Sequence, residues 1–399
     1  MTAMGAIIGG QQPRRVASMG MFALVCAYVS LLFASYLIGV WLIDPSGYPI
    51  PTDFLNVWAA GRLVLQHAPA DAYDWTIHKA VEVLGVRREF ADYFGWHYPP
   101  PFLLVAAALA LLPYPAAMVT WMAVSLPLYL ASMRQIAGRR DVVLAALAWP
   151  AVFWNTVVGQ NGFLTAALLG SGLALIERRP ALAGILIGLL TYKPQFGLLL
   201  PIALIAGRHW RVLGWASASA LGLALLSTVV LGTEPWLAFL HSTAHTNEAI
   251  LVSGLAQFSK LQSLFGQMRA LGASVEMAWA AHGFLVLALA GTVAWLWARR
   301  ANFDTRASFL ATATLLASPY IYLYDLVALA IPLAFLGRQG FSRHETVVVL
   351  IVGALVLWGP DKHAPTGFVA MLLVLCLSLL RARQARADHW RPENSAARI

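Results

Sequence analysis

Long apolar runs alternate along the chain with short clusters of Lys and Arg, and this alternation restricts the possible folds more than any other feature. The 399 residues are 60% hydrophobic and only 11% charged, whereas soluble domains average about 25% charged residues. No globular core can bury so much apolar surface, so the chain must cross a membrane repeatedly. The sequence therefore predicts an all-α polytopic membrane protein built as one domain over residues 1–399.

The basic clusters set the predicted topology, because cytoplasmic loops of membrane proteins carry an excess of Lys and Arg. With Arg14 and Arg15 in the cytoplasm, successive crossings put every basic cluster on one side of the membrane and every Gly/Pro-rich polar motif on the other. This count predicts about 11–12 transmembrane helices, cytoplasmic termini and a basic cytoplasmic tail over residues 381–399. The net charge of +9 follows from that topology and gives no support to nucleic-acid binding.

Residues 102–133 leave the number of crossings open. One net crossing, with a short or re-entrant first piece, keeps the cluster of Arg134, Arg139 and Arg140 in the cytoplasm. Two full crossings would put the same cluster outside.

Motifs for soluble cofactor chemistry do not occur in the sequence. It has no phosphate-binding GxxxxGK[ST] loop, no HExxH metal motif and no dinucleotide fingerprint. The two cysteines, Cys26 and Cys376, lie in apolar runs and are expected to act as small hydrophobes. The sequence therefore predicts no cofactor and gives no support to a metal ion, although a metal bound by the few outward-facing carboxylates stays an open alternative.

Residues 44–98 form a long loop, rich in aromatic residues, between the first two apolar runs. Two helical patterns, near 54–67 and 75–90, are expected to lie in the headgroup region, where Trp and Tyr concentrate. Asp53 stands at the start of the first pattern. It is either the N-cap of that helix or the catalytic base of a membrane enzyme, and a carboxylate at a helix start can serve as both.

Lys193 lies next to a proline, between two apolar half-helices of about eleven residues each, which are short for a bilayer. An ammonium there is costly unless it lines a cavity or has a partner, so a functional role is favoured. The alternative is snorkelling to the membrane surface, which the neighbouring Pro194 and Gln195 make less favoured. Broken helices of this kind predict a cavity open to the outer face.

Other polar residues on the same predicted side have both a functional and a structural interpretation. Asn161 in Gly159–Gly162 is explained by a tight turn, whereas Gln160 offers a donor and an acceptor that a simple turn does not need. Asp325 is either a helix cap or a site residue. The remaining candidates are Asn56, Arg62, His97, Lys260, Tyr320 and Tyr324. The structural alternatives are a position at headgroup level for His97, a solvated loop for Lys260 and the interfacial aromatic belt for the two tyrosines.

The order of these motifs resembles glycosyltransferase family 87, the bacterial polyprenyl-phosphate-mannose-dependent mannosyltransferase-like proteins. The motifs, over roughly residues 50–335, are Asp53 with Trp58-Ala59-Ala60-Gly61-Arg62, Ala72-Tyr73-Asp74, Tyr98-Pro99-Pro100, Gly159-Gln160-Asn161-Gly162, Arg179-Pro180-Ala181-Leu182-Ala183-Gly184, Tyr192-Lys193-Pro194-Gln195, Ser318-Pro319-Tyr320 and Tyr324-Asp325. The resemblance implies a GT-C-like bundle in the bacterial cytoplasmic membrane, with interfacial helices in a long first extracytoplasmic loop. It also implies that the acid of that loop, here Asp53, is the general base. Some members have a histidine-bearing stretch in place of Tyr320–Asp325, which leaves the sugar and the acceptor open.

The sequence and the resemblance together predict inverting transfer of a hexose, mannose in the first instance, from a polyprenyl-phosphate sugar to a glycolipid or glycan acceptor. Asp53 is the predicted base; the residues predicted to bind the donor phosphate are Lys193, Arg62, Lys260, Gln160 and Gln195. The residues predicted to bind substrate are Asn56, His97, Asn161, Tyr320, Tyr324 and Asp325. The alternative is a lipid or solute transporter, but no two-fold repeat is visible and the polar motifs gather on one face. Membrane lipids are expected partners; the oligomeric state is left open.

Overall fold

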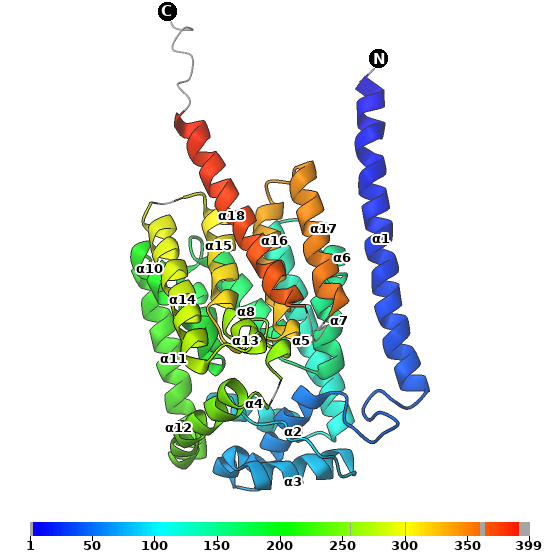
Figure 1. Ribbon diagram of the computed structural model, residues 1–399, viewed down its shortest axis with the longest axis vertical. Helices are drawn as coiled ribbons and strands as arrows, with labels where there is room; N and C mark the ends of the chain where they lie inside the picture. The colour runs from blue at the N-terminus through cyan, green and yellow to red at the C-terminus, as the bar shows by residue number, and fades with distance from the viewer. Residues whose placement is uncertain (1–2, 256, 300, 360–363, 391–399) are drawn as a thin grey trace, which may run out of the picture. The chain divides into compact units, whose positions relative to one another are not determined.

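The computed structural model describes residues 3–255, 257–299, 301–359 and 364–390 (Figure 1). Over these residues the chain forms α-helices and short 3-10 or π turns, with one isolated β-bridge between Ile43 and Pro49 and no strand. The predicted all-α class is confirmed. The side chains of Arg14 and Arg15, and residues 391–399 of the predicted basic tail, lie outside the described part.

Five helices are long and apolar enough to cross a membrane, which confirms the polytopic membrane class. They are α1 (Ala3–Leu37, over its part Val16–Leu37), α5 (Tyr114–Ala137), α11 (Trp210–Leu231), α14 (Val275–Ala298) and α18 (Thr366–Trp390, over its part Thr366–Gln384). Five shorter apolar segments are Pro101–Ala110, Gly162–Leu175, Pro180–Tyr192, Pro194–Ala206 and Leu323–Gly337. The predicted number of crossings, about 11–12, stays a prediction.

The segment whose crossings were left open forms two unequal helices. The first, α4 (Pro101–Ala110), has 10 residues and the second, α5, has 24. At 1.5 Å per residue, α4 covers only about 15 Å, roughly half of the hydrocarbon thickness. This length favours one net crossing with a short first piece.

The chain forms two compact units. Unit 1 contains Met1–Ala167 and Leu223–His245, and unit 2 contains Leu168–Gly222 and Thr246–Ile399. The single-domain prediction stays a prediction. The other helices of unit 1 are α2 (Thr52–Leu65), η1 (Pro69–Tyr73), α3 (Trp75–Val86), α6 (Val142–Leu147) and α7 (Pro150–Val158). Helices α8 (Gly162–Leu175), α11 and α12 (Glu234–Asn247) run from one unit into the other.

Helix α2 is central to unit 1 because it packs closely on α4. A Cβ atom on Gly61 would overlap the backbone of Ala106 and would lie 2.7 Å from Cβ of Ala110. The indole nitrogen of Trp58 donates to the carbonyl oxygen of Leu112 at 3.0 Å. Glycine at the crossing point therefore lets the two helices approach, as small residues do between membrane helices.

The first loop contains the two predicted helices, with shifted boundaries. Helix α2 begins one residue before Asp53, at Thr52, and Pro51 occupies the N-cap position without a side-chain hydrogen bond. Interpretation of Asp53 as the N-cap is therefore wrong. Asp53 lies within the first turn, where a carboxylate is still favoured by the helix dipole. Helix α3 lies beside α2 (Figure 1), and its N-cap is Asp74, whose side chain accepts hydrogen bonds from two backbone amides.

Unit 2 combines the long helices α14 and α18 with shorter helical segments around the buried helix α15. Its remaining elements are α9 (Pro180–Leu189), η2 (Leu190–Tyr192), η3 (Pro194–Gly197), α10 (Leu200–Ala206), η4 (Glu248–Val252), η5 (Phe258–Lys260), α13 (Leu264–Ala270), α15 (Phe303–Leu316), η6 (Leu323–Leu329), α16 (Ala330–Gly337) and α17 (Arg343–Trp358). All 12 residues from Thr305 to Leu316 of α15 are buried, so this helix forms the core of the unit.

Ion pairs join segments of unit 2 that lie next to its basic clusters. Each has an N···O distance of 2.7 Å, and the pairs are Arg306–Glu177, Arg338–Asp304 and Arg381–Glu345. The segment after α8, the start of α15 and the loop after α16 therefore meet at one end of the unit. Two loops with polar motifs contact each other at another place in unit 2. The hydroxyl of Ser263 donates to the carbonyl oxygen of Pro319, and the backbone amide of Gln262 donates to the carbonyl oxygen of Ile321.

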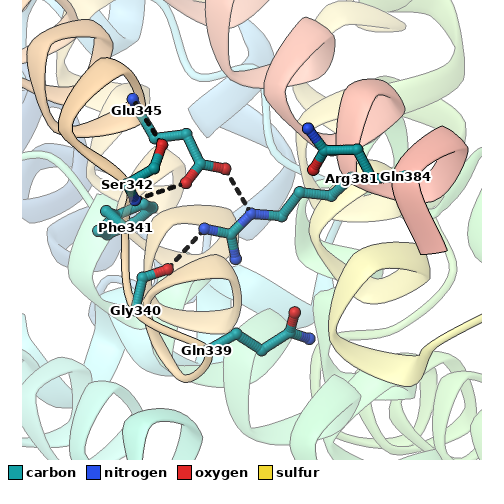
Figure 2. Close-up of a pocket in the computed structure, with 7 residues that line it drawn as sticks. All are labelled: Gln339, Gly340, Phe341, Ser342, Glu345, Arg381 and Gln384. Carbon is teal, nitrogen blue, oxygen red and sulfur yellow. Dashed lines mark hydrogen bonds and ion pairs between the residues drawn. The ribbon is translucent and has the colours of Figure 1, made fainter. Parts of the chain in front are cut away.

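Arg381 on α18 lines a pocket with residues of the loop before α17 (Figure 2). Its guanidinium donates to Glu345 at 2.7 Å, to the carbonyl oxygen of Leu336 at 2.5 Å and to that of Gly340 at 2.6 Å. With these partners the charge of Arg381 is neutralised, and carbonyl groups at the end of α16 and in the loop after it are capped. The pocket thus marks a structural connection between α16, α17 and α18.

Candidate active site

Asp53 lies half-buried in the first turn of α2, and Asn56 follows on the same face with its side chain buried. Tyr48, from the preceding loop, is close to Asp53. Burial, a 2.7 Å hydrogen bond to Asp92 and the charges of Asp92, Asp44 and Asp53 together raise the pKa of Tyr48. The surroundings of Asp53 therefore include a neutral phenol and further acidic groups.

The Gly159–Gly162 loop packs against the same turn of α2. Gly159 has a φ of +72°, in the left-handed region, so the predicted tight turn is confirmed. A Cβ atom on Gly159 would lie 2.5 Å from Cβ of Phe54 and 2.8 Å from Sδ of Met118. Glycine is required here by both conformation and space. The structure thus places this loop directly beside the residue that follows Asp53.

Gln160 is buried and its side-chain oxygen is used within unit 1. That oxygen accepts a 2.9 Å hydrogen bond from the hydroxyl of Tyr98 and a 2.7 Å bond from the backbone amide of Asn161. Tyr98 is fixed in turn because its carbonyl oxygen accepts from the hydroxyl of Tyr73 at 2.9 Å. A role of Gln160 in binding phosphate would therefore fall to its amide nitrogen, since only a donor can bind that anion.

Asn161 is almost completely buried, yet neither polar atom of its side chain has a hydrogen-bond partner among the described residues. The neighbouring Asn155 differs, because its side-chain oxygen accepts from the amide of Gly162 at 2.9 Å. An unsatisfied buried polar group costs about 1–3 kcal/mol. A polar ligand that reached Asn161 would satisfy these atoms, and its predicted binding role stays a prediction.

Two other predicted residues of unit 1, Arg62 and His97, have contacts of their own. Arg62 lies in the last turn of α2, about 14 Å along the helix axis from Asp53, with its guanidinium 5.8 Å from the centre of the Trp58 ring. His97 folds its imidazole ring against Gly95.

Lys193 and Asp325 form a buried ion pair in unit 2. The Nζ atom of Lys193 lies 2.7 Å from Oδ1 of Asp325, and the two side chains are 6% and 4% exposed. The other carboxylate oxygen accepts from the backbone amide of Tyr322 at 3.1 Å, so Asp325 also caps η6. The two interpretations of Asp325, cap and site residue, are therefore compatible, and Lys193 has the partner that its burial requires.

The other candidates of unit 2 have more peripheral environments. Gln195 is half-buried on η3 and Lys260 is exposed at the end of η5. The hydroxyl of Tyr320 donates to Asn247 at 3.3 Å, and Tyr324 stacks on Tyr322 with ring centres 5.4 Å apart. None of these contacts assigns a binding role.

Acidic and imidazole groups do not gather into a cation site in the described part of the chain. No group of three or more His, Cys, Asp or Glu residues there is arranged to hold a metal ion. The prediction that no metal is needed stays a prediction.

His78 and Glu82 are not among the residues predicted from the sequence to belong to the site. They lie four residues apart on α3, and both side chains are fully buried. The i,i+4 spacing within a predicted helix is the signal that pairs them. Their burial has no such signal, because it depends on how α3 packs on α2.

Comparison with known families adds an independent finding. Residues 96–319, more than half of the chain, match the family model described as Glycosyltransferase family 87. Neither a curated protein nor a solved structure matches the chain. The matched span contains the Gly159–Gly162 loop and Lys193, whereas Asp53 lies before it and Asp325 after it.

Proposed function

Because the chain belongs to glycosyltransferase family 87, we propose that it transfers a hexose, mannose in the first instance, from a polyprenyl-phosphate sugar to a glycolipid or glycan acceptor. The chain is a membrane glycosyltransferase on the strength of its family and its apolar helices. Family membership also favours sugar transfer over the transport of a lipid or solute.

The proposed donor follows from the proposed location of the site. The polar motifs lie on the side opposite the basic loops, which is the extracytoplasmic side under the positive-inside rule. Nucleotide sugars are confined to the cytoplasm, so the activated sugar must arrive attached to a lipid. Short, broken helical segments such as Pro180–Tyr192 and Pro194–Ala206 support a cavity within the membrane for the lipid chain.

In the proposed reaction Asp53 acts as general base. It takes the proton of an acceptor hydroxyl while the hydroxyl oxygen forms a bond to the anomeric carbon. The bond from that carbon to the phosphate oxygen breaks on the opposite face, and the electron pair leaves with the polyprenyl phosphate. The product therefore has the inverted anomeric configuration. The observation that supports this assignment is the position of Asp53, half-buried in the first turn of α2, next in sequence to Phe54, which contacts the Gly159–Gly162 loop.

The departing phosphate needs donors that stabilise its growing negative charge. We assign this role first to Lys193, which Asp325 holds in place through their 2.7 Å contact. The half-buried Gln195 follows on η3, directly after Pro194, and the amide nitrogen of Gln160 is a further candidate. The predictions for Arg62 and Lys260 gain no support from geometry, because one lies at the far end of α2 and the other on an exposed turn.

The test is transfer of labelled sugar from synthetic polyprenyl-phosphate sugars to a membrane lipid extract, with the purified protein in detergent. A panel with mannose, glucose and galactose identifies the sugar, and the anomeric configuration of the product tests inversion. A product that retains the donor configuration would overturn the single-displacement mechanism. If no lipid-linked sugar is transferred while another activated sugar is, the donor assignment is wrong.

A further inference from the structure

A histidine of the surface helix α3 contacts the helix that carries Asp53. Nε2 of His78 lies 3.1 Å from the carbonyl oxygen of Asn56, one helical turn after Asp53. His78 and Glu82 are both 0% exposed, and Nδ1 of His78 lies 3.6 Å from Oε1 of Glu82. The three groups form a line from α3 to the first turns of α2.

The hydrogen-bond partners of His78 and Glu82 restrict the protonation states of the two side chains. Nδ1 of His78 and Oε1 of Glu82 have no hydrogen-bond partner among the described residues. If Nε2 donates to the Asn56 carbonyl, Nδ1 of a neutral ring is an acceptor, and an ionised Glu82 offers only acceptors. Two buried acceptors would then face each other. One proton on Glu82 turns this repulsion into a hydrogen bond, after a carboxyl rotation that closes a gap of about 0.5 Å.

The surroundings favour the same neutral state. Burial is the main cause that raises the pKa of Glu82 to about 9 and lowers the pKa of His78 to about 4. Charged and titratable groups face the pair from three elements: Lys79 from α3 itself, Tyr93 and His97 from the segment after α3, and Tyr114 from α5. Lys79 is the one cation among them that favours ionised Glu82, and its ammonium already donates to the carbonyl oxygen of Asp92.

We propose that His78 and protonated Glu82 are positioning residues, which hold the Asp53-bearing turn of α2 through a hydrogen-bond chain from the Glu82 carboxyl through the imidazole to the carbonyl oxygen of Asn56. The inference rests on the proposed function, since it matters for catalysis only if Asp53 is the base. Asp53 and Asn56 are neighbours at i and i+3 on one helix face, so fixing the Asn56 backbone fixes the direction of the Asp53 side chain.

The hydrogen bond from Glu82 to His78 is lost when Glu82 loses its proton, so the proposal predicts a pH dependence of kcat. Raising the pH toward 9 ionises Glu82, so kcat of the wild-type enzyme falls on the alkaline side. Glu82→Gln keeps a donor toward Nδ1 and cannot ionise. It should retain kcat near neutral pH and lose the alkaline decline, whereas Glu82→Ala should lower kcat about ten- to hundredfold with a smaller change in KM. Glu89→Gln, at an exposed acid just beyond α3, is the matched control.

Thermal unfolding of the same variants without substrate separates this inference from the proposed function. Folded Glu82 holds a proton that the unfolded chain releases, so Glu82 makes wild-type stability fall as the pH rises toward 9. His78 acts in the opposite sense up to about pH 6.5, because its pKa is lowered on folding, so the decline due to Glu82 is expected between about pH 6.5 and 9. Glu82→Gln should remove that decline even if no donor is ever turned over. The inference is overturned if Glu82→Gln is as impaired as Glu82→Ala, or if the pH dependences of kcat and of unfolding are unchanged in Glu82→Gln.

Discussion

At the scale of single residues, the ion pair of Lys193 and Asp325 makes unit 2 sensitive to the loss of either partner. Both charges are almost completely removed from water, and each is compensated by a contact of 2.7 Å with the other. Burial of a charge is tolerated only with such a partner, and loss of one partner costs more than loss of both. The pair therefore couples stability to the proposed phosphate site.

Lys193→Ala should reduce stability as well as donor binding. The uncompensated Asp325 carboxylate is expected to cost about 3–5 kcal/mol, which thermal unfolding in detergent would detect. The double variant Lys193→Met with Asp325→Leu should recover stability but not donor affinity, since it restores packing without a cation. Arg211→Ala, at an exposed cation of unit 2 outside the predicted site, is the control. If Lys193→Ala has the unfolding temperature and the donor affinity of the wild type, Lys193 neither stabilises unit 2 nor binds the donor phosphate.

Residue pairing across the chain is also where the sequence is least informative. Lys193 and Asp325 were predicted as members of different sets because 132 positions separate them and nothing local connects them. The need of Lys193 for a partner was predictable from its apolar flanks, but the identity of the partner was not. His78 and Glu82 had a visible i,i+4 spacing, and only the packing of α3 on α2 shows that they are buried.

At the scale of secondary-structure elements, α2 is the helix that positions the proposed catalytic base. Its N-terminus carries Asp53, and its middle contacts α4 through Gly61. The sequence pattern located this helix to within two residues at either end. It misassigned the cap, because Asp is a more usual N-cap than the Pro51 that stands there.

Gly61→Ala should separate α2 from α4. Its added methyl group would overlap the Ala106 backbone, which cannot rotate away as a side chain could. We expect a loss of about 1–3 kcal/mol in unfolding free energy, with reduced transfer because the start of α2 shifts. Gly283→Ala on α14 has open space around the new methyl group and should be neutral or slightly stabilising. Equal unfolding temperatures for Gly61→Ala and the wild type would contradict the close α2–α4 packing.

At the scale of the whole molecule, the sorting of loops between the two sides of the membrane stays a prediction. It was made from charge and spacing alone, with the clusters of Lys and Arg assigned to one side. In unit 2 the ion pairs Arg306–Glu177 and Arg338–Asp304 bring segments next to three of these clusters together, as that sorting requires. The number of crossings is harder to predict, since helices of 10 to 14 residues such as α4 and α8 fall below the length of a full span.

Thiol labelling of intact cells tests the topology. In a background with Cys26 and Cys376 replaced by Ser, a cysteine at Ser46 of the first loop should react with a membrane-impermeant reagent from outside. A cysteine at His344, at the start of α17, should react only after permeabilisation. Both positions are exposed, so reactivity reports the side of the membrane. Labelling of both from the same side would contradict the predicted arrangement.

The most direct test of the central claim is transfer by Asp53→Asn. The amide keeps the size and polarity of the side chain but cannot accept the acceptor proton, so kcat should fall about 10²- to 10⁴-fold. Donor affinity and unfolding temperature should stay close to those of the wild type, because Asp53 does not cap α2. Turnover at the wild-type rate by Asp53→Asn would show that Asp53 is not the base.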